Sequence, residues 1–159
     1  MPYAVLTLVL IVVDQVVKLL VMQHIPLGEH VPFIPCLLDL TYVQNTGAAF
    51  SMLSEHTWLL ALISLVLSGV LALALWKSFF RHPLGKLCLT LLLAGAVGNL
   101  IDRVLRHFVV DMFNVLFMDF AVFNVADICV VVGGIGAAIY YLFLMDKLEG
   151  THDKADADL

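Results

Sequence analysis

Four long apolar stretches dominate this chain and restrict the folds that it can adopt. A helix needs about 20 apolar residues to cross the hydrocarbon of a bilayer. Four segments approach that length: about Tyr3–Met22, Thr57–Trp76, Leu84–Val104 and Val122–Met145. Only 13% of the 159 residues are charged, whereas a soluble domain averages about 25%. The sequence therefore predicts an integral membrane protein with four transmembrane helices.

The four spans and their connections form one expected domain, residues 1–147, followed by a short acidic cytoplasmic tail at 148–159. The first apolar run lacks a basic flank, and Asp14 and Lys18 interrupt it. We therefore expect a retained span and not a cleavable signal peptide. The three cysteines, at positions 36, 88 and 129, are widely spaced and predict neither a disulfide framework nor a zinc site.

Basic residues predict the orientation of the spans, because cytoplasmic loops carry an excess of Lys and Arg. Five basic residues flank one side of the spans: Lys77, Arg81, Lys86, Lys147 and Lys154. Arg103 and Arg106, after the third span, count against the pattern, but they are only two. Both termini and the central link are thus expected in the cytoplasm, and the two longer loops outside.

The two outer loops contain strand-forming residues. The segment Leu37–Val43 is rich in such residues, Asn45-Thr-Gly47 is typical of a turn, and Phe108–Phe120 is aromatic and β-branched. These loops predict a small extracytoplasmic β-sheet lying on the outer leaflet. The expected fold class is an all-α membrane protein of four transmembrane helices with that sheet added.

Two aspartates, Asp111 and Asp127, bracket a segment at the membrane edge. An ionisable residue at membrane depth is costly and is a functional-site hypothesis by default. Two carboxylates that share one proton can activate water, as in aspartic proteases. Asp111 taken alone reads equally well as a solvated loop acid, and Asp127 also suits the N-terminal turn of a helix. Asp39, Asp102 and Asp119 are competing acids; we rank Asp102 lower because it can pair with the adjacent Arg103.

Other polar residues interrupt the apolar runs at helical spacing. Asp14 and Lys18 are four apart and can form an ion pair, which either anchors the first span or orients loop backbone near a site. Asn99 needs hydrogen-bond partners at membrane depth, and Arg103 lies four residues later on the same face. Asn124 precedes Asp127 by three and shares its helix face.

Small residues accompany these polar groups. Gly95, Ala96 and Gly98 allow close helix packing in lipid. In Asn45-Thr-Gly-Ala-Ala-Phe50 the glycine, Gly47, and the alanines leave room for a substrate chain, although an ordinary turn explains the segment equally well.

Four blocks, taken together, resemble the bacterial lipoprotein signal peptidase (signal peptidase II) family over nearly the whole chain. They are Asp14-x-x-x-Lys18, Asn45-Thr-Gly-Ala-Ala-Phe50, Gly98-Asn-Leu-Ile-Asp-Arg103 and Phe123-Asn-Val-Ala-Asp127, in the family's order and spacing. The resemblance implies a multi-pass inner-membrane aspartic endopeptidase with its active site toward the outer face. Such an enzyme removes the signal peptide from diacylglyceryl-modified prolipoproteins by cutting before the lipidated cysteine.

The resemblance also implies the roles of individual residues and partners. Asp111 and Asp127 would be the catalytic pair. The supporting positions would be Asp14, Lys18, Asn45, Gly47, Gly95, Asn99, Arg103 and Asn124. The partners would be the lipid-modified prolipoprotein and membrane lipid, with the cyclic peptide globomycin as an inhibitor. We expect a monomer with no metal, organic cofactor or nucleic-acid partner.

Two other classes of protein also fit parts of the sequence. A small proton-coupled transporter would use intramembrane carboxylates as a relay, but it would need acids spread across the membrane, whereas these gather toward one face. A non-catalytic assembly subunit would suit the small-residue faces but would not need the two aspartates. No His-Glu-x-x-His or Gly-x-Ser-x-Gly motif points to another hydrolase.

Overall fold

Four long helices form the body of the protein in a computed structural model that describes residues 1–47 and 57–149. The helices are α1 (Pro2–His24), α2 (Thr57–Trp76), α3 (Pro83–Leu105) and α4 (Val125–Ile139), and α4 continues as a π-helical stretch, η2 (Tyr140–Leu144). Each of the four is long and apolar enough to cross a membrane, the fourth being continuous to Glu149. The predicted four-span architecture is confirmed, although α4 begins three residues later than expected.

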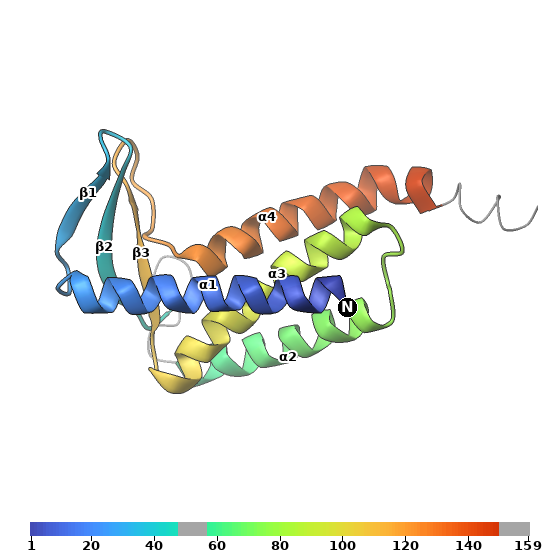
Figure 1. The fold of residues 1–159 in the computed structure, drawn as a ribbon, viewed down its shortest axis with the longest axis horizontal. Coiled ribbons are helices and arrows are strands. Elements are labelled where there is room, and N and C mark those ends of the chain that lie inside the picture. Colours follow the sequence, from blue (N-terminus) through green and yellow to red (C-terminus); the bar gives the residue numbers. More distant parts are fainter. Residues whose placement is uncertain (48–56, 150–159) are drawn as a thin grey trace, which may run out of the picture.

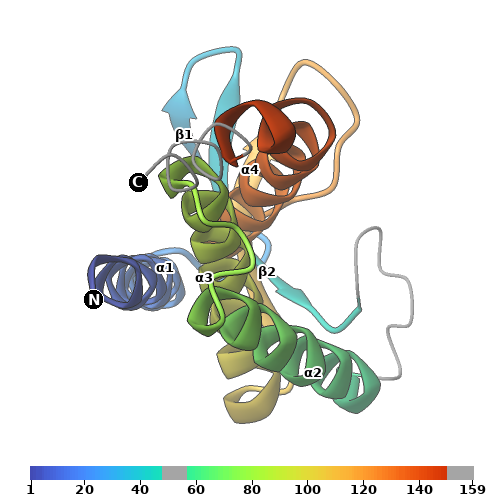
Figure 2. The same ribbon diagram turned by 90° about the vertical axis from the view of Figure 1, so that its right-hand side faces the viewer.

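Helix α3 occupies the centre of the bundle. It packs against α1, α2 and α4 (Figure 2), and more of its length is buried than that of the other three. Many large aliphatic side chains on α1, α2 and α4 instead stand exposed, for example Leu8, Leu65 and Val131. In water such surfaces would be unfavourable, but lipid tails are as apolar as these side chains. Because the aliphatic side chains can face lipid, the interior of the bundle can contain the polar residues.

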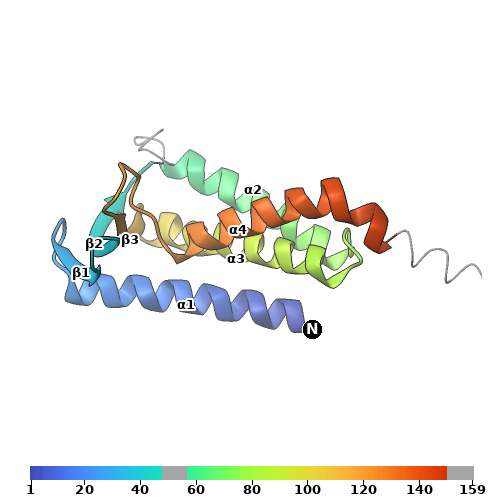
Figure 3. The same cartoon turned by 90° about the horizontal axis from the view of Figure 1, so that it is seen from above.

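A three-stranded antiparallel sheet closes one end of the bundle. Its strands are β1 (His30–Ile34), β2 (Leu38–Asn45) and β3 (Val109–Val115), in the order β1-β2-β3. The sheet lies at the opposite end from the N-terminus and from the link between α2 and α3 (Figures 1 and 3). The predicted sheet is confirmed, and β1 is an additional strand that the sequence did not indicate, since Pro32 interrupts it and all five of its residues are exposed.

The end of the fourth span is packed against another part of the bundle. Glu149 closes the last helical turn and accepts hydrogen bonds from the Tyr140 hydroxyl and from the backbone N–H groups of Arg81 and His82. These contacts tie the end of the fourth span to the link between α2 and α3. The rest of the acidic tail lies outside the described residues, as do Ala48, Ala49 and Phe50 of the turn block.

Candidate active site

The first turn of α4 fixes the position of Asp127. Asn124 is the N-cap residue, and its Oδ1 accepts a hydrogen bond from the Asp127 backbone N–H at 2.9 Å. Asp127 Oδ2 in turn accepts from the Asn124 backbone N–H at 3.1 Å. This reciprocal pattern is a capping box, which satisfies two of the free N–H groups at a helix start. The Asn-x-x-Asp motif seen in the sequence therefore fixes the Asp127 carboxylate at the start of the fourth span.

Asp111 lies on β3 and is almost fully buried, with 2% of its surface exposed. It pairs in register with Val43 on the central strand β2. Both of its carboxylate oxygens accept hydrogen bonds from amide side chains: Oδ1 from Asn124 Nδ2 at 2.6 Å and Oδ2 from Asn45 Nδ2 at 2.9 Å. Asp111 is thus held between the sheet and the residue that caps α4.

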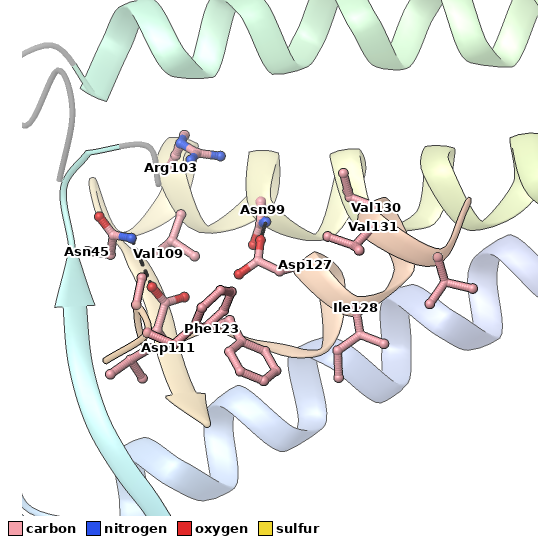
Figure 4. Close-up of a pocket in the computed structure, with 14 residues that line it drawn as sticks. Asn45, Asn99, Arg103, Val109, Asp111, Phe123, Asp127, Ile128, Val130 and Val131 are labelled. Atoms are coloured by element: carbon pink, nitrogen blue, oxygen red, sulfur yellow. Dashed lines mark hydrogen bonds between the residues drawn. The ribbon is translucent and has the colours of Figure 1, made fainter. Parts of the chain in front are cut away.

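Asp111 and Asp127 line one cavity (Figure 4). Asn99, on α3, connects them: its Nδ2 donates to Asp127 Oδ1 at 2.8 Å, and its Oδ1 accepts from Asn124 Nδ2 at 3.2 Å. Since Asn124 also donates to Asp111, two amides form a continuous bridge between the two carboxylates. The fold brings together two acids that are separated by a loop in sequence.

A buried cation lies behind this bridge. Lys18, on α1, has no exposed surface, and its Nζ lies 2.9 Å from Asp14 Oδ2, 3.0 Å from Asp102 Oδ2 and 3.0 Å from Asn99 Oδ1. The predicted Asp14–Lys18 ion pair is confirmed. Three acceptors match the three N–H donors of an ammonium group, and a buried charge is tolerated when it is paired and fully hydrogen-bonded.

The same cluster anchors the backbone next to each aspartate. Asp14 Oδ1 accepts from the Ala126 backbone N–H at 2.9 Å, one residue before Asp127. Asp102 Oδ2 accepts from the Val110 backbone N–H at 3.1 Å, one residue before Asp111. Carboxylates on α1 and α3 therefore hold the start of α4 and the start of β3 in fixed positions.

The expected pairing of Asp102 with Arg103 is wrong. Asp102 instead binds Lys18 and Arg106, the C-cap residue of α3 four positions later. Adjacent helical residues point about 100° apart and do not face each other, whereas residues four apart do. Asp102 makes these contacts inside the buried cluster, and for this reason it does not line the cavity.

Arg103 lines the cavity and approaches two groups on other elements. Its terminal nitrogens lie 3.5 Å from Ser64 Oγ and from the Gly47 carbonyl oxygen, to which they donate. Gly47 also donates its backbone N–H to Asn45 Oδ1 at 2.9 Å. Among the described residues, the Arg103 Nε is a buried donor without a partner. A guanidinium with spare donors beside the two carboxylates can bind a carbonyl group of a ligand.

Glycines on α3 allow α4 to approach closely. A Cβ added at Gly95 would overlap the Ala126 carbonyl oxygen of α4, and one added at Gly98 would lie 3.2 Å from Ala126 Cβ of α4 and 2.8 Å from Asp14 Oδ2 of α1. The predicted small-residue packing is confirmed at both positions. This close approach lets Asn99, on the same helix, reach Asp127.

The cavity has a volume of about 510 Å³ and mainly apolar walls, and it includes Ile128, Val130 and Val131 of α4. A second hollow of about 500 Å³ lies beside it along β2 and shares Asn45 and Asp111 with the first. Within the described residues, no three His, Cys, Asp or Glu side chains are grouped to hold a metal ion. The chemistry available in this cavity comes from carboxylates, amides and one guanidinium.

Burial raises the pKa of Asp111 to about 6. The hydrogen bond from Asn45 lowers the pKa, the negative charge of Asp127 raises it, and the Asn124 hydrogen bond and the Lys18 charge oppose the rise. Desolvation and a neighbouring carboxylate are the usual reasons why an acid keeps its proton near neutral pH. Asp111 can therefore act as a proton donor under conditions in which an ordinary aspartate is fully ionised.

Sequence reasoning overlooked two members of the site, Gln15 and Arg106. Gln15 Nε2 donates to the Gly98 carbonyl oxygen and to Asp102 Oδ1, both at 3.1 Å. Its Oε1 accepts a hydrogen bond from Arg106 at 3.0 Å. A signal was available for both. Gln15 is polar inside an apolar span and so requires partners, and Arg106 follows Asp102 at a helix pairing distance.

Fold and site together define a multi-pass membrane protein that holds two carboxylates beside an apolar cavity, at the sheet end of a four-helix bundle. The sequence model of the family described as signal peptidase (SPase) II matches residues 6–143. The chain belongs to this signal peptidase II family.

Relatives and solved structures are similar over most of their length. The lipoprotein signal peptidase of Streptococcus pneumoniae is 49% identical over 136 residues, which are 82% of this chain and 85% of that protein. The lipoprotein signal peptidase of Latilactobacillus sakei is 38% identical over 151 residues, 95% of this chain and 98% of that protein. A bacterial membrane enzyme solved by the in meso method at 2.3 Å resolution superposes with a TM-score of 0.83 at 29% identity, covering 93% of this chain and 90% of that one.

Proposed function

We propose that this protein is an intramembrane aspartic endopeptidase that removes signal peptides from diacylglyceryl-modified prolipoproteins. Cleavage falls just before the lipidated cysteine. Membership of the signal peptidase II family supports the substrate class. The observation that carries the catalytic assignment is that Asp111 and Asp127 line one cavity and are bridged by Asn99 and Asn124.

The proposed reaction needs one proton on the pair. A water bound between the carboxyl groups attacks the scissile carbonyl carbon, the ionised carboxylate takes the water's proton, and the protonated carboxyl donates to the carbonyl oxygen. The tetrahedral intermediate then collapses: the carboxyl that took the water's proton gives it to the leaving nitrogen, and one hydroxyl of the intermediate returns a proton to the other carboxylate. The products are the carboxyl end of the signal peptide and the free amine of the lipidated cysteine, and the pair again holds one proton.

Asp111 is the proposed holder of that proton at the start of the cycle. Its pKa of about 6 makes it the acid that retains a proton at higher pH than an ordinary aspartate. The two titrations are coupled, so the apparent values measured in an assay belong to the pair. Asp127 then acts as the base that activates water.

The substrate is proposed to enter sideways from the bilayer. Two residues that line the cavity, Ile128 and Val131, are also exposed on α4, with 43% and 56% of their surfaces accessible. A signal helix and an acyl chain can therefore reach the cavity without leaving the hydrocarbon. The segment around the scissile bond would lie between the carboxylates and β2, with Arg103 binding one of its carbonyl groups.

We also propose that the sheet end faces outside and both termini face the cytoplasm. The link between α2 and α3, which carries Lys77 and Arg81, lies at the end of the bundle opposite the sheet, and Lys86 follows in the first turn of α3 (Figure 1). Cys36 is exposed between β1 and β2, whereas Cys129 is buried. In intact spheroplasts, a membrane-impermeant thiol reagent should label Cys36 and fail to label Cys36→Ser; protection of Cys36 until the membrane is opened would overturn the orientation.

The enzymatic proposal is tested with purified protein and two precursors, one diacylglyceryl-modified and the other unmodified. We expect cleavage of the lipidated form alone, before the modified cysteine, and inhibition by globomycin. Asp111→Asn and Asp127→Asn should fold and insert but lose cleavage by at least about 10³-fold, since each removes one partner of the acid–base pair. Near-normal cleavage by either variant would refute the pair.

A further inference from the structure

Lys18 lies outside the cavity, yet its position determines how an amide faces a proposed catalytic carboxylate. We propose that Lys18 is a positioning residue, which fixes the orientation of the Asn99 side chain so that Asn99 donates to Asp127. This inference rests on the proposed function, because Asp127 is the group that it positions.

Lysine Nζ donates three hydrogen bonds and accepts none. Lys18 has three oxygen neighbours at 2.9–3.0 Å, on Asp14, Asp102 and Asn99. Asn99 therefore has to present its Oδ1 to Lys18.

The side-chain amide of Asn99 is planar, so its oxygen and nitrogen point in different directions. When Oδ1 faces Lys18, Nδ2 is directed to the other side, where it lies 2.8 Å from Asp127 Oδ1. Rotating the amide by 180° would place Nδ2 against the N–H donors of Lys18 and Oδ1 against the Asp127 carboxylate. Two hydrogen bonds would then be replaced by two repulsive contacts. A buried cation and a carboxylate on opposite sides of Asn99 thus select one orientation.

The other two amides of the site are oriented by the same principle. Asn124 presents Oδ1 to the Asp127 backbone N–H and so directs Nδ2 to Asp111. Asn45 presents Oδ1 to the Gly47 backbone N–H and so directs Nδ2 to Asp111. A backbone N–H can only donate, as lysine does. Asn99 differs because the two donors to its Oδ1, Lys18 Nζ at 3.0 Å and Asn124 Nδ2 at 3.2 Å, are side chains, and the cationic one can be removed by mutation.

A purely structural role for Lys18 makes a different prediction. Lys18 also neutralises Asp14 and Asp102, and loss of that charge would destabilise the bundle. Such damage would act independently of Asn99. If Lys18 acts through Asn99, removing Lys18 has little further effect on turnover once Asn99 no longer carries an amide.

The experiment is a double-mutant cycle with Lys18→Met and Asn99→Leu, assayed on a diacylglyceryl-modified precursor. We expect each single variant to lower kcat by about 10²-fold, the loss typical of a misplaced reacting group, with KM within about twofold of wild type. In the Asn99→Leu background, Lys18→Met should lower kcat by less than about threefold. Multiplying losses in the double variant would overturn the proposal.

Two further variants keep the result interpretable. Asn99→Asp retains an acceptor for Lys18 but has no N–H for Asp127, so it decides the question if Lys18→Met does not fold: a tenfold or greater loss of kcat supports the proposal, and wild-type kcat overturns it. Lys77→Met removes an exposed lysine at the opposite end of the bundle and should leave kcat unchanged. Absence of cleavage by the wild type would instead refute the proposed function, which separates the two failures.

Discussion

The close approach of α3 and α4 at Gly95 gives a quantitative prediction for Gly95→Ala. The added methyl group would overlap the Ala126 carbonyl oxygen and lie 2.7 Å from Val130 Cγ2, whereas carbon atoms in good contact are about 3.5–4.0 Å apart. The two helices must therefore separate by about 1 Å. Overpacking of this kind costs about 1–3 kcal/mol, which outweighs the gain of up to about 1 kcal/mol from replacing a helical glycine.

The separation also reaches the site. Ala126 immediately precedes Asp127, whereas Val110, the residue before Asp111 on β3, donates its backbone N–H to Asp102 of α3. Moving α4 away from α3 therefore changes the spacing between the two carboxylates. A displacement of about 1 Å in a reacting group can lower the rate by about 10²-fold, so activity should fall far more than the modest loss of stability suggests.

Two glycines provide matched controls for the same substitution. Gly69, on α2, has no atom within 4 Å of an added Cβ, and at Gly134, on α4, the nearest neighbour is Leu92 Cδ2 at 3.7 Å. Gly69→Ala should raise the thermal midpoint, and Gly134→Ala should leave activity unchanged. After the gain from replacing glycine, a net cost of about 1–2 kcal/mol remains for Gly95→Ala. The midpoint should therefore fall by about 2–8 °C, because a protein of this size loses about 2–4 °C per kcal/mol.

Thermal unfolding in detergent is monitored by the labelling of the buried Cys129 thiol as it becomes accessible. Activity is measured by cleavage of a lipidated precursor. A Gly95→Ala variant that matches Gly69→Ala in both midpoint and rate would refute the proposed overlap. So would a rate loss at Gly95 no larger than that at Gly134, since the proposed cause is the specific contact with Ala126.

Three further outcomes are expected. Asp14→Ala leaves the Ala126 N–H without its acceptor, whereas Asp14→Asn keeps a carbonyl oxygen there. The alanine variant should therefore be less stable than the asparagine variant by about 1–3 kcal/mol. Equal thermal midpoints of the two variants would count against this anchoring role. The pKa of Asp111 is about 6, so its protonated form is lost as pH rises through that value. A profile of kcat/KM from pH 4 to 9 should therefore decline above about pH 6. A flat profile between pH 5 and 8 would contradict the assignment of the proton to Asp111. Tyr140→Phe loses a 2.6 Å hydrogen bond to Glu149 at the far end of the bundle and should cost about 1–3 kcal/mol without changing kcat, a result to be checked by parallel melting and turnover measurements.

Much of the fold follows from local properties of the sequence. A run of about 20 apolar residues has few alternatives to a membrane helix, because every backbone N–H and C=O must be hydrogen-bonded within hydrocarbon. The sheet was also predictable from local sequence, since Leu37–Val43 and Phe108–Phe120 contain strand-forming residues in loops between spans. Strand β1 was not, because its exposed residues and Pro32 give no strand signal and it forms by pairing with β2.

Asp102 shows why the site was harder to predict than the fold. Its neighbour in sequence, Arg103, was the expected partner, but its partners in space are Lys18 on α1 and Arg106 one turn later. Sequence proximity cannot rank such alternatives, because the choice depends on which helix faces are brought together. Gln15 was overlooked for the same reason, since its contacts with Gly98, Asp102 and Arg106 are all made between helices.

The sequence alone determined the four spans, the polar blocks and the two candidate carboxylates, because the cost of placing polar groups in hydrocarbon is a property of each residue and its near neighbours. Tertiary structure decided which donors reach which carboxylate. Asp111 obtains its hydrogen bonds from Asn45 and Asn124, and Asp127 obtains one from Asn99. These donors come from separate elements, so their directions are fixed only when the helices and the sheet have packed together.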